Sequence, residues 1–349
     1  MTEREKLIGL QYLRAIAALM VAYFHLRVQT PSYTQYLTTH TWINTDYLQG
    51  AVPLFFVISG FVMYVSGIQS SPAKFIWHRI GRIVPLYWCL TLAIVALTLI
   101  FPGLLHHTVA SARNVTKSLL FIPYSRYPIL VPGWSLNFEM FFYALFAMVL
   151  FIPLQWRLAT LLLTLTTLCA IGVAIPSLRT NEIGLTYTSD FLLLFGFGLV
   201  LGYLYKRGRL ALPLIPSIAL ALIGLYALIG ASGFGWVRDY AAPVAVVLGI
   251  VSIDASGNTP SLPWLLMLGD ASYSIYLIHP FAFDLVGKTW QRFHIGSSPV
   301  EVITYALLSL GAAVGMALMT YGLIEQPALR LFKWKGTQKV ARRATVAAG

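Results

Sequence analysis

The chain consists largely of apolar stretches that are long enough to cross a lipid bilayer. Of its 349 residues, 58% are hydrophobic and only 10% are charged, whereas soluble domains carry about 25% charged residues. A membrane-spanning helix needs about 20 consecutive, mostly apolar residues. Ten stretches qualify, at 9–27, 48–68, 82–101, 133–153, 157–175, 188–205, 211–230, 236–254, 264–287 and 300–324. We therefore expect an all-α integral membrane protein, folded as a single bundle of about ten transmembrane helices.

The basic residues predict the orientation of this bundle, because short cytoplasmic loops carry an excess of Lys and Arg. With the N-terminus inside, 15 of the 24 basic residues fall on the cytoplasmic side, 8 fall outside, and Arg14 lies within the membrane. This distribution predicts an N-in/C-in domain over residues 1–330 and a disordered basic cytoplasmic tail over residues 331–349. Inner-loop cations contact anionic membrane lipid, so the net charge of +12 requires no nucleic-acid partner.

The first apolar stretch contains two ionisable residues, Arg14 and His25. Such side chains are costly in a bilayer, so they usually face the protein interior and mark a site. At about 100° per residue, the helix makes roughly three turns between Arg14 and His25, which places both side chains on one face about 16 Å apart. A histidine accepts and returns a proton near neutral pH. His25 is therefore suited to deprotonate a hydroxyl that attacks a thioester.

Four further blocks carry polar or aromatic residues. They are Phe55-Phe56-x-x-Ser59-Gly60-Phe61, Arg79-x-x-Arg82, Gly133-Trp134-Ser135-Leu136-x-x-Glu139 and the run from Gly269 to Pro280. Together with the pair Arg14 and His25, these blocks resemble the acyltransferase-3 family of integral-membrane O-acyltransferases, over essentially the whole chain. Within that family the motifs are most similar to those of the bacterial exopolysaccharide acetyltransferase branch.

The resemblance implies a multi-pass enzyme of the bacterial inner membrane that moves an acyl group, acetyl in this branch, from cytoplasmic acyl-coenzyme A to a hydroxyl of a cell-envelope or exported polysaccharide. Acyl-CoA is then a co-substrate, and neither a permanently bound cofactor nor a metal is expected. Two alternatives stay open. Intramembrane charge also suits a transporter or flippase of a lipid-linked glycan, and the same acyltransferase chemistry could serve a small-molecule or lipid acceptor. Against transport, the chain shows no internal repeat and no pair of broken helices.

His25 and Glu139 are predicted to form the catalytic centre. Glu139 lies a few residues into a helix that enters from outside, and His25 lies near the outer end of the first helix, so their depths agree within about two turns. A carboxylate there would orient the imidazole and stabilise the imidazolium. The alternatives are a structural His25 that binds a backbone carbonyl or caps the helix, and a Glu139 that is hydrogen-bonded to Trp134 or Asn137.

The resemblance assigns the donor to three arginines. Arg79 and Arg82 share one face at the inner end of the third predicted helix, and guanidinium groups bind phosphates in a bidentate manner. They would take the nucleotide end of CoA, and Arg14 would lie along the path of the acyl-bearing arm and contribute to catalysis. The alternatives are simple topological anchoring for Arg79 and Arg82, and a charge pair of Arg14 with Glu325 or Asp270.

Five residues are predicted to contact the acceptor along its path. They are Trp134, Asn137, Tyr143, Tyr273 and His279. Trp134 and Tyr143 are equally well explained as aromatic residues of the membrane interface. Tyr273 and His279 are equally well explained as hydrogen-bonding contacts between helices, and Gly60 is expected to permit close packing of two helices.

Overall fold

The computed structural model describes residues 7–29, 51–101, 111–125, 127–230, 235–257, 259–293 and 298–333, so most of the expected basic tail lies outside it. All regular secondary structure in these ranges is helical, which confirms the all-α class. The elements are α1 (Ile8–Gln29), α3 (Ala51–Gly67), α4 (Pro72–Ile100), α5 (Ala112–Leu119), η2 (Val131–Gly133), α6 (Trp134–Val149), α7 (Leu154–Ala174), η3 (Pro176–Thr180), α8 (Glu182–Tyr187), α9 (Leu192–Lys206), α10 (Leu214–Gly230), η4 (Val237–Ala241), α11 (Ala242–Ala255), α12 (Pro263–Asp270), α13 (Ser272–Arg292), α14 (Pro299–Thr320), η5 (Tyr321–Glu325) and α15 (Gln326–Leu331).

Several of these segments have the length and composition of membrane spans. Among the described residues, five qualify: Ile8–Leu26, Pro72–Ile100, Leu154–Ala174, Glu182–Lys206 and Val300–Leu331. Two shorter apolar helices are also present, at Ala51–Gly67 and Leu214–Ile229. Several apolar helices in one chain are the expected mark of a multi-pass membrane protein.

The third predicted helix begins earlier than expected, which changes the position of two arginines. The apolar pattern places its start at residue 82, whereas α4 begins at Pro72 after an N-cap at Ser71, whose side chain accepts a hydrogen bond from Lys74 N. A capping serine followed by proline at the first helical position is a strong start signal. Arg79 and Arg82 therefore lie two to three turns inside a helix rather than at its mouth.

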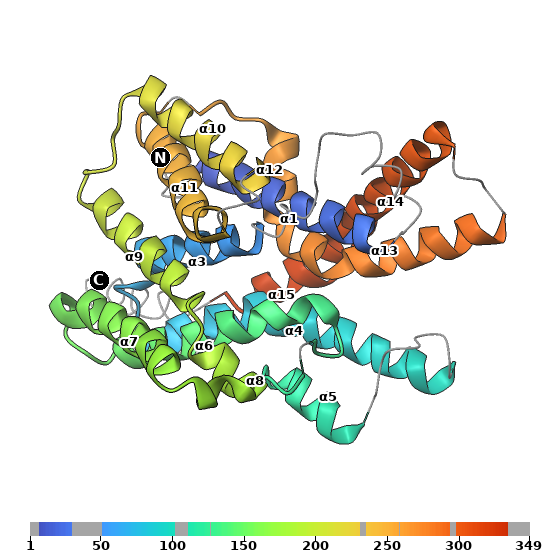
Figure 1. The fold of residues 1–349 in the computed structure, drawn as a ribbon, viewed down its shortest axis with the longest axis horizontal. Coiled ribbons are helices and arrows are strands. Elements are labelled where there is room, and N and C mark those ends of the chain that lie inside the picture. The colour runs from blue at the N-terminus through green and yellow to red at the C-terminus, as the bar shows by residue number, and fades with distance from the viewer. Residues whose placement is uncertain are drawn as a thin grey trace, which may run out of the picture.

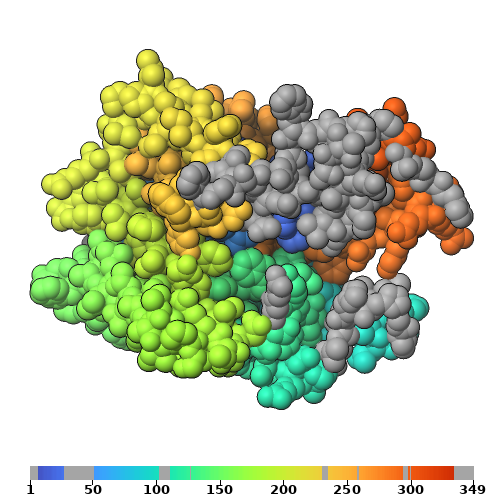
Figure 2. All heavy atoms as spheres, in the orientation of Figure 1, coloured from blue at the N-terminus to red at the C-terminus, as the bar shows by residue number. Residues whose placement is uncertain are grey.

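The ninth predicted helix is two helices. Residues 264–287 were expected to form one span, but α12 ends at Asp270 and α13 begins at Ser272, with Ala271 between them. α13 then forms a hairpin with α14, and this hairpin projects from one side of the molecule (Figures 1 and 2). The break directs Ser272, Tyr273 and Tyr276 towards the interior, where they line a cavity.

α1 runs through the middle of the molecule and packs against α3, α11, α12 and α13 (Figure 1). A second group, below it in that view, contains α4, α6, α7 and α8. The closest helix pair is α3 with α9, because two glycines remove side chains from their crossing. A Cβ on Gly60 would overlap the carbonyl of Phe195, and one on Gly198 would overlap that of Val57. The expectation for Gly60 is confirmed.

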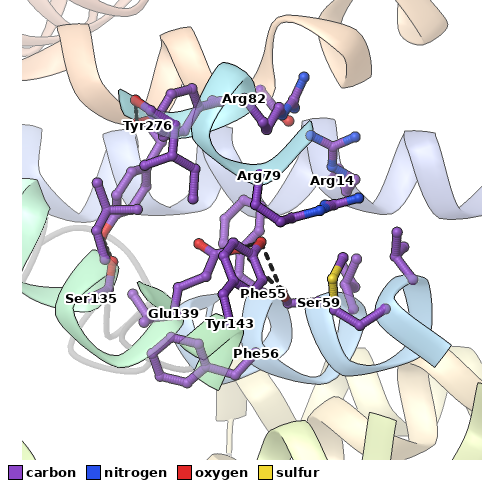
Figure 3. A pocket seen from close by; sticks show the side chains of 18 residues that line it. Arg14, Phe55, Phe56, Ser59, Arg79, Arg82, Ser135, Glu139, Tyr143 and Tyr276 are labelled. Atoms are coloured by element: carbon purple, nitrogen blue, oxygen red, sulfur yellow. Dashed lines mark hydrogen bonds between the residues drawn. The ribbon is translucent and has the colours of Figure 1, made fainter. Parts of the chain in front are cut away.

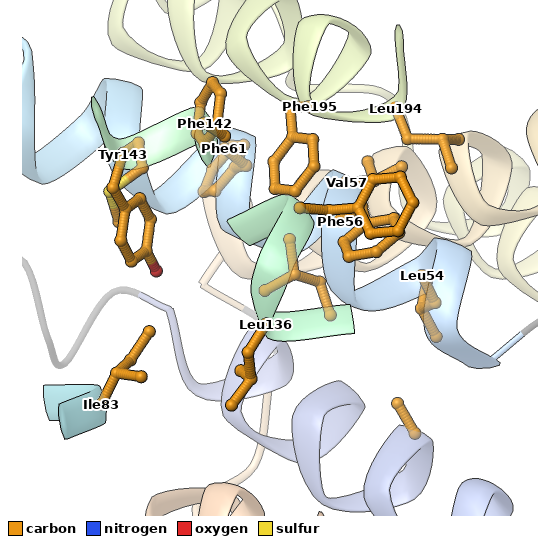
Figure 4. Close-up of a cluster of buried hydrophobic side chains, with 14 of the residues drawn as sticks. Leu54, Phe56, Val57, Phe61, Ile83, Leu136, Phe142, Tyr143, Leu194 and Phe195 are labelled. Atoms are coloured by element: carbon orange, nitrogen blue, oxygen red, sulfur yellow. The ribbon is translucent and has the colours of Figure 1, made fainter. Parts of the chain in front are cut away.

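Aromatic rings fill the space between α3, α6 and α9 (Figure 4). Phe195 stacks on Phe142 with ring centroids 4.4 Å apart and contacts Phe56 at 4.8 Å. Phe142 and Phe195 are fully buried, and aromatic pairs stabilise a core beyond their buried area. This cluster fixes α3 against α6, and both helices present polar residues on the side that faces α1 and α4.

Candidate functional site

The first cavity in the bundle, which we term the arginine cavity, has a volume of about 150 Å³ and lies between α1, α3, α4, α6 and α13 (Figure 3). Its charged lining residues are Arg14, Arg79, Arg82 and Glu139. The expected grouping of the three arginines is therefore observed. Figure 3 shows Arg79 extending towards Arg14 across the cavity. Tyr143 and Tyr273, which were predicted to contact a substrate, also line this cavity.

The guanidinium groups of this cavity retain unused hydrogen-bond donors. Arg79 Nε and Arg82 Nη2 are buried and have no hydrogen-bond partner in the described part of the chain. Arg14 Nη1 donates to Gln11 Oε1 at 2.9 Å. A buried donor without a partner costs about 1–3 kcal/mol or more when it is charged. Such groups are expected where an anion binds, because a phosphate would satisfy them.

Glu325, which the sequence analysis offered as a charge partner of Arg14, contacts this site through Arg82. It ends the π-helix η5 and is 1% exposed, and π-helical turns often occur at functional sites. Its Oε1 pairs with Arg82 Nη1 at 2.9 Å, and its Oε2 accepts a hydrogen bond from Ser274 at 2.6 Å. The alternative in which Glu325 pairs with Arg14 is thus replaced by a direct pair with Arg82.

Glu139 is bound by two side chains of the arginine cavity. It accepts hydrogen bonds from Ser59 at 3.1 Å and from Tyr143. Ser59 belongs to the Phe55-to-Phe61 motif on α3, and Figure 3 shows it directed at Glu139. No spacing in the sequence indicates this contact, because 80 residues separate the two.

The second cavity, which we term the histidine cavity, has a volume of about 520 Å³. Its polar lining residues are His25, Ser125, Asn137, Arg179, Glu182, Thr186, Ser189, Asp190, Arg238 and Asp239, and its aromatic ones are Phe24, Tyr127, Trp134, Phe138 and Phe191. His25, Trp134 and Asn137 are therefore brought together as expected. Asn137 is 6% exposed and lines this cavity.

The backbone fixes the tautomer of His25. Its Nδ1 lies 2.9 Å from the carbonyl oxygen of Val21. A carbonyl only accepts, so neutral His25 carries its proton on Nδ1 and presents a bare lone pair on Nε2. This contact is the backbone bond that the structural alternative required, and it also leaves Nε2 free to act as a base.

The ring partner of His25 is His279 rather than Glu139. The two imidazole centroids lie 4.9 Å apart, while Glu139 lines the other cavity. Similar depth along two helices does not fix the direction in which each side chain points about its own axis, and this is why the expected pairing was wrong. His279 is completely buried and lines neither cavity, so it lies behind His25 rather than on the acceptor's path.

Val52 borders both cavities. Among the described residues it alone appears in the lining of both. It is the second residue of α3, and the same helix face continues to Phe55 and Ser59 in the arginine cavity. The two cavities thus approach each other at one side chain.

Comparison with known proteins agrees with the family resemblance of the sequence motifs. Residues 7–320 match the family described as "Acyltransferase domain". The chain is 38% identical to the exopolysaccharide production protein ExoZ of Rhizobium meliloti (strain 1021), over 80% of this chain and 89% of ExoZ. It is 29% identical to nodulation protein 10 of Rhizobium leguminosarum bv. viciae, over 88% of each. It is 24% identical to O-acetyltransferase OatA of Staphylococcus aureus (strain NCTC 8325 / PS 47), over 91% of this chain and 56% of OatA. No solved structure matches the chain.

Proposed function

This chain belongs to the acyltransferase-3 family, and on that premise we propose that it transfers an acetyl group from cytoplasmic acetyl-CoA to a hydroxyl of a cell-envelope or exported polysaccharide. The names of its relatives, one in exopolysaccharide production and one an O-acetyltransferase, support this acceptor and this acyl group. The observation that carries the proposal is the pair of cavities that meet at Val52, one lined by arginines and the other by a histidine.

The arginine cavity suits the donor. Coenzyme A carries phosphates, which guanidinium groups bind with good geometry, and Arg79 Nε and Arg82 Nη2 have no other partner in the described ranges. At about 150 Å³ the cavity is smaller than the roughly 300–1,000 Å³ of typical ligand pockets. It therefore holds only the narrow part of the donor, the thioester arm with the phosphate to which it is attached, and the nucleoside lies outside it. Glu139 balances part of the positive charge of the arginines.

The histidine cavity suits a sugar. Sugar hydroxyls donate hydrogen bonds, and the carboxylates of Glu182 and Asp190 only accept them. The Asn137 amide offers both donors and an acceptor, and the Trp134 ring offers an apolar face. At about 520 Å³ the cavity lies within the ordinary range for a bound ligand.

His25 is the base in this proposal. Its Nε2 takes the proton of the acceptor hydroxyl while the hydroxyl oxygen forms a bond to the thioester carbon. The carbon–sulfur bond then breaks, and the proton passes from His25 to the thiolate of coenzyme A. The products are the acetyl ester and free coenzyme A. No side-chain nucleophile is required.

We propose that the bundle lies in the bacterial inner membrane with ten spans and both ends inside. The segments that line the histidine cavity, 123–125, 127, 179–191 and 238–239, belong in this topology to outer loops or to the outer ends of spans. Predicted inner ends also meet: Gly9 N donates to Asp254 Oδ1 at 2.8 Å, and Arg157 Nη1 donates to Ile68 O at 2.5 Å. Large apolar side chains on the surface of α7 and α10 would contact membrane lipid.

The proposal is tested by mass spectrometry of the polysaccharide from a deletion strain that is complemented with wild type or with His25→Ala. Wild type should restore O-acetylation, and His25→Ala should reduce it at least about a hundredfold, the low end of the contribution of a general base. His78→Ala is the matched control, since His78 lies in neither cavity lining. Normal acetylation by a His25→Ala protein that is present in the membrane would refute the mechanism.

A further inference from the structure

Val52 is the described residue that the linings of the two cavities share. The face of α3 that follows it lines the arginine cavity, while Val52 itself also borders the histidine cavity. A donor in one cavity and an acceptor in the other would therefore come closest to each other near this side chain. The isopropyl group of Val52 therefore stands beside the point where the two substrates meet.

Several residues that line the arginine cavity together with Val52 are apolar and firmly held. They include Phe55, Ile58 and Leu136, of which Ile58 and Leu136 are buried. Phe55 packs against the ring of Tyr276 at a centroid distance of 5.9 Å. The Tyr276 hydroxyl is hydrogen-bonded to Ser135 Oγ at 2.7 Å and donates to the carbonyl of Pro132 at 2.9 Å. Such a wall does not yield easily to extra volume, because protein interiors are close-packed.

We infer that Val52 sets the length of the acyl chain that this protein transfers, and that it restricts the donor to acetyl and similarly short acyl-CoA. The inference rests on the proposed function, since it concerns the same reaction. In that reaction the acyl carbon exchanges its bond to sulfur for a bond to the acceptor oxygen, and the proton moves through His25 to the sulfur. The acyl chain beyond that carbon then lies against Val52.

The physical basis is steric. A methyl group is the smallest acyl tail, and each added methylene must occupy space that the isopropyl group of Val52 already fills. One methylene in an apolar pocket changes discrimination between substrates by about 10–200-fold. Val52→Ala removes two methyl groups at this point and opens the space that a longer tail requires. The structure thus predicts a gain of function, which a poorly folded protein cannot imitate.

The experiment compares acetyl-, propionyl- and butyryl-CoA as donors, each radiolabelled in the acyl group. Inside-out membrane vesicles from the complemented deletion strain provide the protein together with its own acceptor. The measured quantity is the ratio of butyryl to acetyl transfer. Val65→Ala is the matched control, since Val65 is another valine of α3 and lines neither the arginine cavity nor the histidine cavity. Val52→Ile serves as the opposite change.

Val52→Ala should raise the butyryl-to-acetyl ratio by about tenfold or more, Val65→Ala should leave it unchanged, and Val52→Ile should lower the propionyl-to-acetyl ratio. An unchanged ratio in both Val52 variants, or an equal rise in Val65→Ala, would overturn the inference while leaving the proposed function in place. A wild-type protein that transfers no acyl group from any donor would overturn the proposed function, and this inference with it.

Discussion

His25 and His279 are held in the same way at the residue scale. Each Nδ1 lies close to the carbonyl oxygen four residues earlier, at 2.9 Å from Val21 and 3.2 Å from Ile275. Each ring therefore presents an Nε2 lone pair when neutral. His279 Nε2 is buried without a hydrogen-bond partner in the described part of the chain. Because the two ring centroids lie 4.9 Å apart, we expect the neutral imidazole of His279 to stabilise the imidazolium that forms when His25 takes a proton.

His279→Phe tests this role, because phenylalanine keeps an aromatic ring but has no lone pair. We expect kcat to fall roughly tenfold, while KM for acyl-CoA stays unchanged. A tenfold fall corresponds to the loss of about 1.4 kcal/mol of transition-state stabilisation. His279→Gln, whose side-chain oxygen accepts a hydrogen bond, should retain more activity. Steady-state kinetics with labelled acetyl-CoA provide the measurement. A rise in KM with normal kcat in His279→Phe would show that the residue acts only on donor binding.

The pair of Arg82 and Glu325 makes a prediction about stability. Glu325→Ala leaves the Arg82 guanidinium without its carboxylate, and removing one partner of a buried ion pair costs about 3–5 kcal/mol. We expect the lower end of this range, because the Arg82 side chain is 22% exposed. The measurement is unfolding of the purified protein in detergent. The double variant Arg82→Leu/Glu325→Leu should recover much of the loss, and equal stability of wild type and Glu325→Ala would contradict the prediction.

Some residues of the site are predictable from the sequence and others are not. Arg14 and His25 are found from helical periodicity within one segment, and Arg79 with Arg82 from charge within another. The bond between Ser59 and Glu139, and the contact between His25 and His279, join segments that lie far apart in the chain. A single sequence does not specify how each helix is rotated about its own axis, and so does not specify which neighbour a given side chain faces. The partners of His25 and Glu139 were therefore beyond sequence reasoning.

At the scale of the elements, the packing of α3 on α9 depends on glycine. Gly60 and Gly198 each face a carbonyl group of the opposite helix, within the overlap distance of a Cβ. Small residues at such crossings let helix backbones approach closely in a membrane. Because α3 carries Val52 and Ser59, this close approach also fixes the wall of both cavities.

Gly60→Ala should therefore destabilise the protein by about 1–3 kcal/mol, the usual cost of overpacking, and should reduce activity through the displaced α3. Gly311→Ala on α14 is the control, since a Cβ there meets no atom within 4 Å. Alanine is favoured over glycine in a helix by up to about 1 kcal/mol, so that variant should be neutral or slightly stabilised. The measurement is thermal unfolding of Gly60→Ala and Gly311→Ala, and equal destabilisation of the two variants would refute the packing argument.

Local signals explain which element boundaries were predictable. Ser71 and Pro72 mark the start of α4, but the hydrophobic pattern begins ten residues later and dominated the prediction. The break at Ala271 between α12 and α13 has no proline or glycine at the break itself. Tertiary packing sets that boundary, so an apolar stretch alone predicts one helix where the structure has two.

At the scale of the whole molecule, the arrangement separates two kinds of chemistry. Three arginines and one glutamate line the arginine cavity, whereas the histidine cavity is lined by His25 and Asn137 together with side chains of both charges. The helix class and the presence of intramembrane charge follow from composition. The separation into two cavities does not, because it arises from the way segments at residues 123–125, 127, 179–191 and 238–239 come together around His25.

Transfer across the membrane is tested most directly by sidedness. Labelled acetyl-CoA, which does not cross membranes, is added outside vesicles of known orientation that contain the protein and its acceptor. With inside-out vesicles the cytoplasmic face is exposed, and we expect label on polysaccharide within the lumen, with none in the Arg79→Ala/Arg82→Ala variant. Right-side-out vesicles should remain unlabelled. Label on polysaccharide only when acetyl-CoA is supplied to the outer face would contradict a donor that enters through the arginine cavity from the cytoplasm.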